Sequence, residues 1–275
     1  ETEKNIVAEW FALLQILPSL KSFRNVYKFK VIYSDYAKKF IQDAINHSKT
    51  AASGTSDIDI GNNIHERLKS FGFEKITLKD YQIRDLKRLV SIPHGANFSV
   101  QGSGKTAVTI ALHLLLREKN EVNSFIIVSP KNAFLAWQED GVDELLNEEN
   151  PLRKEGLIEL KGGFDKIRNI LSSGKKNFIV SYDTLVNITS LIGHFILNPK
   201  NKVHVILDES HKIKSEDALR TGAAQTLATL PVVRKDILTG TPLPNKLEDI
   251  NTQFQFLYPG PEYSGDRFWV RTTKR

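Results

Sequence analysis

A glycine-rich loop, Ser-Val-Gln-Gly-Ser-Gly-Lys-Thr at residues 99–106, constrains the fold of this chain more than any other stretch. An apolar segment at residues 96–100 leads into it, and an apolar run at residues 107–116 follows with the character of a buried helix. A strand, a loop and a helix in this order point successive backbone N–H groups at an anion, which the helix dipole also favours. The usual phosphate-loop pattern has glycine at its first position, where this chain has Ser99, and an ordinary glycine-rich turn is the alternative.

The residues at the end of this loop have the types that a nucleotide phosphate requires. Gly102 and Gly104, on either side of Ser103, can adopt positive φ and let the backbone close around a phosphate. Lys105 would reach the β- and γ-phosphates, and the Thr106 hydroxyl would ligate Mg²⁺. The loop therefore predicts half of a nucleotide site.

A pair of carboxylates supplies the other half. Asp208 and Glu209 directly follow a second apolar run at residues 203–207. An aspartate at the end of a buried strand can hold Mg²⁺ opposite Thr106, and the neighbouring glutamate can polarise an attacking water as general base. The alternative is that the two acidic residues simply cap the following helix.

Apolar strand-like runs alternate with helical ones through most of the chain. The strands are expected at residues 98–100, 125–129, 157–160, 178–181, 203–207 and 236–239. This alternation predicts an α/β fold with a mostly parallel sheet that is flanked by helices on both faces.

The N-terminal part differs in character. Residues 1–50 predict a small α+β accessory domain, with a helix at residues 1–17, a strand at 27–33 and a helix at 36–45. Residues 51–63 are rich in small and polar side chains and predict a linker. The phosphate loop then belongs to a domain at residues 64–275.

Composition restricts the class of protein. Hydrophobic residues make up 40% and charged residues 25%, as in soluble globular proteins. Cysteine is absent, which excludes disulfides and thiol catalysis. No apolar run reaches the ~20 residues of a membrane span, so we expect no membrane partner and a cytoplasmic location, or a nuclear one in a eukaryote. The net charge of +6 favours a polyanionic partner.

Six sequence blocks together resemble the first RecA-like lobe of a superfamily 2 helicase-type ATPase, and most of all the Swi/Snf-type double-stranded DNA translocases. In chain order they are residues 78–82, 102–106, 129–138, 181–185, 208–214 and 238–259. Three departures stand out: Ser99 and Val100 replace the acidic pair common in that branch, and Ser210 replaces the more usual alanine. None of them removes a catalytic group.

The resemblance implies ATP and Mg²⁺ as cofactors and assigns roles to particular residues. Gln82 would read the adenine edge, Lys105 and Thr106 would bind phosphate and Mg²⁺, Asp208 would contact Mg²⁺, and Glu209 would be the base. The coupling of nucleotide state to nucleic acid would fall to His211, Thr239, Gly240 and Thr241. Contacts to the phosphodiester backbone would fall to Lys131, Ser181 and Tyr182.

The implied function is ATP hydrolysis coupled to translocation on double-stranded DNA. Members of this family carry a second RecA-like lobe whose arginines complete the ATP site, so we expect this chain to be a fragment that is nearly inactive alone. Residues 1–50 are a possible contact for a protein partner. The alternatives are a strand-separating helicase on single-stranded DNA or RNA, and a nucleotide-responsive scaffold that binds nucleic acid.

Overall fold

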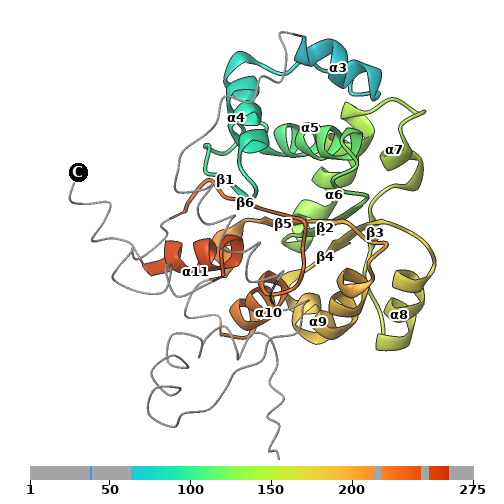
Figure 1. Cartoon of the computed structure of the whole chain (residues 1–275), viewed down its shortest axis with the longest axis vertical. Helices are drawn as coiled ribbons and strands as arrows, with labels where there is room; N and C mark the ends of the chain where they lie inside the picture. Colours follow the sequence, from blue (N-terminus) through green and yellow to red (C-terminus); the bar gives the residue numbers. More distant parts are fainter. Residues whose placement is uncertain (1–37, 39–62, 214–217, 243–247, 260–275) are drawn as a thin grey trace, which may run out of the picture.

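One parallel sheet forms the centre of the molecule. The computed structural model describes residues 38, 63–213, 218–242 and 248–259. Within them, six parallel strands lie in the order β1-β6-β5-β2-β4-β3 (Figure 1). Their bounds are β1 Gly95–Asn97, β2 Ser124–Val128, β3 Ile158–Glu159, β4 Asn177–Val180, β5 Val203–Asp208 and β6 Arg234–Leu238. The predicted parallel sheet is confirmed, whereas the predicted accessory domain and linker lie outside the described residues, apart from Lys38 and Asn63.

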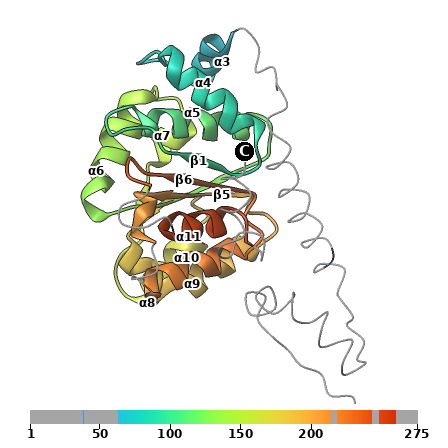
Figure 2. The same cartoon turned by 90° about the vertical axis from the view of Figure 1, so that its left-hand side faces the viewer.

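Helices cover both faces of the sheet, as Figure 2 shows. One face carries α3 Ile64–Ser70, α4 Asp80–Ser91, α5 Lys105–Glu118, α6 Phe134–Ala136, the π-helix η2 Trp137–Asp143 and α7 Pro151–Glu155. The other carries α8 Phe164–Ser172, α9 Tyr182–Leu197, α10 Ala218–Ala228 and α11 Glu248–Leu257. Two short 3₁₀ helices, η1 Lys131–Ala133 and η3 Ser210–Lys212, follow strands β2 and β5. No helix in the described ranges is both long and apolar enough to cross a bilayer.

Alternation along the strands divides the core into two layers. On β2, Phe125 and Ile127 pack among the residues of α4 and α5, whereas Ile126 and Val128 pack among those of α9 and α10. Successive side chains of a strand point to opposite faces, so a strand covered on both faces is apolar throughout. The predicted buried helix after the loop is α5, whose residues 107–116 are all buried.

The first strand lies three residues earlier in the chain than its sequence predicts. Residues 98–100 are not a strand, because β1 ends at Asn97. The Asn97 side-chain oxygen accepts hydrogen bonds from the Ser99 N–H (3.1 Å) and the Ser99 hydroxyl (2.6 Å). Such a side-chain contact two residues along turns the chain away from the ladder. The loop therefore starts at Phe98, one residue before the glycine-rich stretch expected from the sequence.

Candidate nucleotide site

The ends of three neighbouring strands meet at one edge of the sheet. β6 lies between β1 and β5, with Leu238 in register with Asn97 on one side and Asp208 on the other. Because the strands are parallel, the loop after β1, the carboxylates at the end of β5 and the Thr239 segment after β6 emerge side by side. Ligands of open α/β sheets bind at such carboxyl ends.

The Lys105 side chain folds back and binds the backbone of its own phosphate loop. Gly102 and Gly104 have φ of +74° and +80°, and Gly104 immediately precedes helix α5. The Lys105 amino group donates to the backbone oxygens of Ser99 (3.0 Å) and Val100 (3.1 Å). Both acceptors are neutral carbonyl oxygens. Phosphate oxygens can displace them, because a charged acceptor binds an ammonium group more strongly.

Gln82 anchors the loop from helix α4. Its side chain is only 7% exposed. The oxygen accepts the Lys79 N–H (2.8 Å), and the amide nitrogen donates to the Ser103 carbonyl (2.9 Å), which also accepts from the Tyr81 hydroxyl (3.2 Å). Both ends of the amide are thus engaged within the protein, and its adenine contact stays a prediction.

Asp208 is held by residues to which the sequence reasoning assigned no role at the ATP site. Its Oδ2 accepts the Ser129 hydroxyl (2.7 Å) and the Trp137 indole N–H (2.8 Å), and its Oδ1 accepts the Glu209 N–H (3.0 Å). Trp137 opens the π-helix η2, an irregularity that is frequent at functional sites. Ser129 and Trp137 both lie inside the sequence block at residues 129–138. Their membership of that block was the only sign in the sequence that they could belong to the site.

The three residues predicted to contact a phosphodiester backbone differ in exposure. Lys131 is exposed, but Ser181 and Tyr182 are each 4% exposed. The Ser181 hydroxyl accepts the Thr184 N–H (3.1 Å) and caps α9. The Tyr182 hydroxyl donates to the Asp208 carbonyl (2.7 Å). Burial raises the pKa of Tyr182 well above its usual value, and the charge of Asp208 adds to this, so the hydroxyl stays protonated as a donor.

Glu209 and the predicted coupling residues form one cluster. Glu209 has φ of +49°, a left-handed conformation that is uncommon for a residue other than glycine. The His211 Nδ1 lies 3.2 Å from a Glu209 carboxylate oxygen and 2.9 Å from the Thr239 hydroxyl. The Thr241 N–H donates to the Thr239 hydroxyl (3.1 Å). The structure therefore brings the predicted base and the predicted coupling residues together.

Gly240 joins this cluster to the phosphate loop. A Cβ at Gly240 would lie 3.0 Å from the Gln101 side chain and 3.8 Å from the Lys105 amino nitrogen. The segment after β6 therefore lies so close to the loop that a side chain at Gly240 would have to displace Gln101.

The residues predicted to hold Mg²⁺ are suited to it in chemical type. The Thr106 hydroxyl and the Asp208 carboxylate are hard oxygen ligands. Within the described part of the chain, no group of three or more histidine, cysteine or acidic side chains could cage a metal ion. A Mg²⁺ bound with a nucleotide takes most of its ligands from phosphates and water, so two protein oxygens fit this requirement.

Comparison with known proteins identifies the family. The SNF2-related domain matches residues 100–274, well over half of the chain. The chain belongs to this family. It is 26% identical to the SWI/SNF chromatin-remodeling complex subunit snf22 of Schizosaccharomyces pombe over 90% of its length, and 27% identical to the ATP-dependent helicase brm of Drosophila melanogaster over 73%. It spans only 16% and 12% of those two proteins.

Solved structures agree with the fold. The Sulfolobus solfataricus SWI2/SNF2 ATPase core in complex with dsDNA matches 71% of this chain with a TM-score of 0.53 at 22% identity. The chain covers 39% of that protein. The Pyrococcus furiosus Hef helicase domain matches 64% of the chain with a TM-score of 0.50 at 17% identity, and 35% of that domain is covered. These structures confirm the RecA-like fold, and the SNF2-related family match confirms the Swi/Snf-type resemblance.

Proposed function

We propose that this SNF2-related chain is the ATP-binding motor lobe of a nucleic-acid-dependent ATPase that couples hydrolysis to translocation on double-stranded DNA. The observation that carries the proposal is the convergence of Lys105, Glu209 and the Thr239 segment at one edge of the sheet. Family membership supports ATP as substrate. The DNA-bound Sulfolobus core supports duplex DNA as the track.

The chain's own residues supply the phosphate-binding lysine and the general base. Lys105 leaves its two backbone acceptors to bind the β- and γ-phosphates, and Glu209 takes a proton from the attacking water. Thr106 and Asp208 would hold Mg²⁺, which would supply charge neutralisation at the phosphates when bound. A second lobe in the same protein would supply arginines, whose contribution to rate is ~10³ to 10⁵, so this lobe alone is nearly inactive.

The substitution Glu209→Gln in the full-length protein tests the hydrolytic role. Removing a general base lowers the rate by ~10² to 10⁴, while ATP binding, measured with a fluorescent analogue, persists. Glu148→Gln is a matched control, because the Glu148 side chain is 87% exposed and lies outside the site. Unchanged hydrolysis in Glu209→Gln would favour the scaffold alternative.

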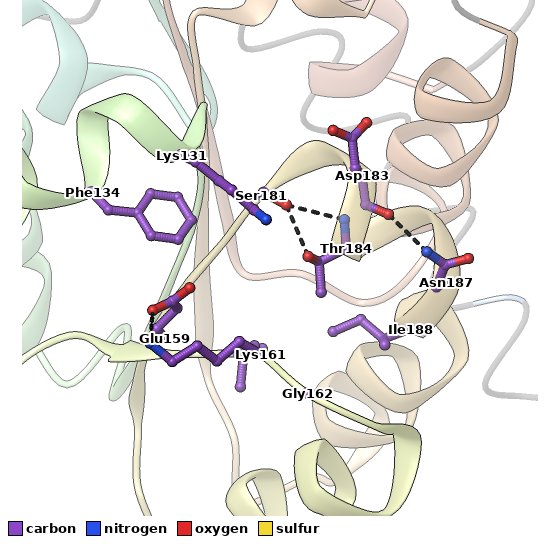
Figure 3. A pocket seen from close by; sticks show the side chains of 11 residues that line it. Lys131, Phe134, Glu159, Lys161, Gly162, Ser181, Asp183, Thr184, Asn187 and Ile188 are labelled. Carbon is purple, nitrogen blue, oxygen red and sulfur yellow. Dashed lines mark hydrogen bonds and ion pairs between the residues drawn. The ribbon is translucent and has the colours of Figure 1, made fainter.

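A surface hollow beside the nucleotide site is suited to the DNA backbone. A cavity of about 270 Å³ is lined by Lys131 from η1, by Lys161 and Gly162, and by Ser181 at the N-terminus of α9 (Figure 3). Lys161 is paired with Glu159 (2.5 Å). Lysine side chains and a helix N-terminus attract phosphate irrespective of base sequence.

Salt dependence tests this surface. Lys131→Ala should weaken duplex binding equally for all sequences and reduce the slope of log K against log [salt] by about one unit. Lys119→Ala is the control, because Lys119 follows the opposite end of α5.

Displacement of a third strand from a triplex without unwinding of the duplex would distinguish translocation from strand separation.

A further inference from the structure

Gln253 bridges two of the segments that form the nucleotide site. It lies on α11 and is fully buried, with 0% exposure. Its side-chain oxygen accepts a hydrogen bond from the Ser210 hydroxyl (2.6 Å), and its amide nitrogen donates to the Pro242 carbonyl (2.9 Å). Ser210 directly follows Glu209, and Pro242 directly follows Thr241. A single side chain thus connects the carboxylate segment to the segment after β6.

The Ser210 hydroxyl is the buried donor on one side of this bridge. Ser210 is also 0% exposed, and it is the residue that the sequence analysis noted in place of a more usual alanine. A buried polar group destabilises a protein when it is left without a hydrogen bond, so loss of either side chain would remove a partner from the other. The two residues therefore form one polar unit in a core position.

Helix α11 is a firm support for the bridge. The Gln225 side chain of α10 donates to the Thr252 carbonyl (2.9 Å), and the Tyr258 hydroxyl at the end of α11 donates to the His94 carbonyl (2.6 Å). Phe256 is fully buried in the core. The segment ending at Pro242 cannot move relative to Ser210 without carrying α11 or breaking a Gln253 hydrogen bond.

The two segments also touch directly, since His211 Nδ1 lies 2.9 Å from the Thr239 hydroxyl, but the contact to Glu209 itself is weak. The Thr239 hydroxyl lies 3.4 Å from the Glu209 carboxylate, near the limit of a hydrogen bond. The position of Thr239 relative to Glu209 therefore depends on His211 at the site and on the Gln253 bridge in the core.

We propose that Gln253 is a positioning residue that fixes residues 239–242 relative to Glu209 and so transmits nucleotide state to the nucleic-acid track. This inference rests on the proposed function. Loss of the bridge leaves the phosphate loop intact, because Gln253 does not contact it in any hydrogen bond of the described residues. ATP binding should therefore persist while stimulation of hydrolysis by DNA falls.

Three variants of the full-length protein test the role: Ser210→Ala, Gln253→Leu and the two combined. Gln253→Leu removes the hydrogen bonds to Ser210 and Pro242 and leaves the Ser210 hydroxyl without this acceptor. The double variant replaces both polar side chains by apolar groups. Such paired replacement can be nearly neutral for stability. We expect the double variant to recover the thermal stability that Gln253→Leu loses, yet to keep its low DNA stimulation, about tenfold below wild type.

Gln225→Leu is the matched control, because it breaks another buried glutamine contact to α11 and leaves both site segments alone. It should lower the melting temperature and leave DNA stimulation unchanged. Recovery of both stability and DNA stimulation in the double variant would reduce Gln253 to a packing residue, as would normal stimulation in Gln253→Leu. A wild-type protein whose ATP hydrolysis does not respond to DNA would instead overturn the proposed function.

Discussion

The Trp137 indole N–H donates a 2.8 Å hydrogen bond to Asp208 Oδ2. The Ser129 hydroxyl donates to the same oxygen (2.7 Å), so two donors from the β2 side fix the carboxylate. Trp137 is 2% exposed and its ring meets Phe125 edge-on at 6.5 Å between centroids. Its position is therefore set by the core, and it can orient Asp208 toward a Mg²⁺ beside Thr106.

Trp137→Phe keeps a ring in this position but removes the donor. We expect a higher Mg²⁺ requirement and ATP hydrolysis reduced by about 10- to 100-fold, the usual effect of losing a group that orients a metal ligand. Ser129→Ala removes the other donor to the same oxygen, so the double variant should lose less than the sum of the two effects. A Mg²⁺ titration of hydrolysis in the full-length protein measures this, and identical Mg²⁺ dependence in all variants would contradict it.

Alanine substitutions of the two loop glycines can be compared, because an added side chain would clash with a neighbour at Gly104 but not at Gly102. Both have positive φ, which costs an alanine roughly 1–2 kcal/mol. A Cβ at Gly104 would also lie 2.2 Å from the Gln82 amide nitrogen, whereas a Cβ at Gly102 meets nothing within 4 Å in the described structure. Without nucleotide, Gly102→Ala should lower the melting temperature slightly, and Gly104→Ala should lower it more and abolish ATP binding. Thermal melting and titration with a fluorescent ATP analogue measure the two effects, and equal losses would contradict the steric argument.

Local patterns explain which parts of the fold were predictable. Helix α5 and the strands have apolar runs that can be recognised without knowing their neighbours, and the order of strands and helices alone predicts a parallel sheet. The loop residues, Asp208 and Glu209 were found because each stands at the end of such a run. The left-handed conformation of Glu209 has no such signal.

Long-range partners were not predictable in the same way. Ser129 and Trp137 meet Asp208 only because β2 lies beside β5 in the sheet, and strand order is not contained in periodicity. The burial of Tyr182 likewise depends on its contact with Asp208. The end of β1 was misplaced because a side-chain contact from Asn97 competes with an otherwise apolar sequence.

Gln82 allows the predicted adenine contact to be separated from the anchoring of the loop. Gln82→Glu keeps an acceptor for the Lys79 N–H but cannot donate to the Ser103 carbonyl. We expect weaker binding of both ATP and GTP, because the loop loses its anchor, and a smaller preference for ATP, because a carboxylate cannot pair with both polar groups of the adenine edge. Competition binding with the two nucleotides measures the ratio, and an equal loss for both would limit Gln82 to anchoring.

Lys235 predicts an unusual dependence of stability on pH. It lies on β6 with 3% exposure, its amino group donating to the Ala228 carbonyl (3.2 Å). Burial lowers its pKa from 10.5 to about 7. Between these two values the unfolded chain binds the proton and the folded chain does not, so the lysine's contribution to stability rises with pH across that window. Below pH 7 the amino group is charged in both states and its full cost of burial is present.

Lys235→Met removes this cost and should stabilise the protein most at and below pH 7. The difference in unfolding free energy between variant and wild type should shrink steadily from pH 7 toward pH 10, at up to about 1.4 kcal/mol per pH unit. Lys119→Met is the control, since the Lys119 side chain is 36% exposed and its replacement removes no buried charge. Urea unfolding at pH 6.5, 8 and 9.5 is a suitable measurement. A difference that stays constant over these ~3 units of pH would mean that Lys235 keeps its proton when folded, because only a group whose protonation differs between the two states makes stability depend on pH.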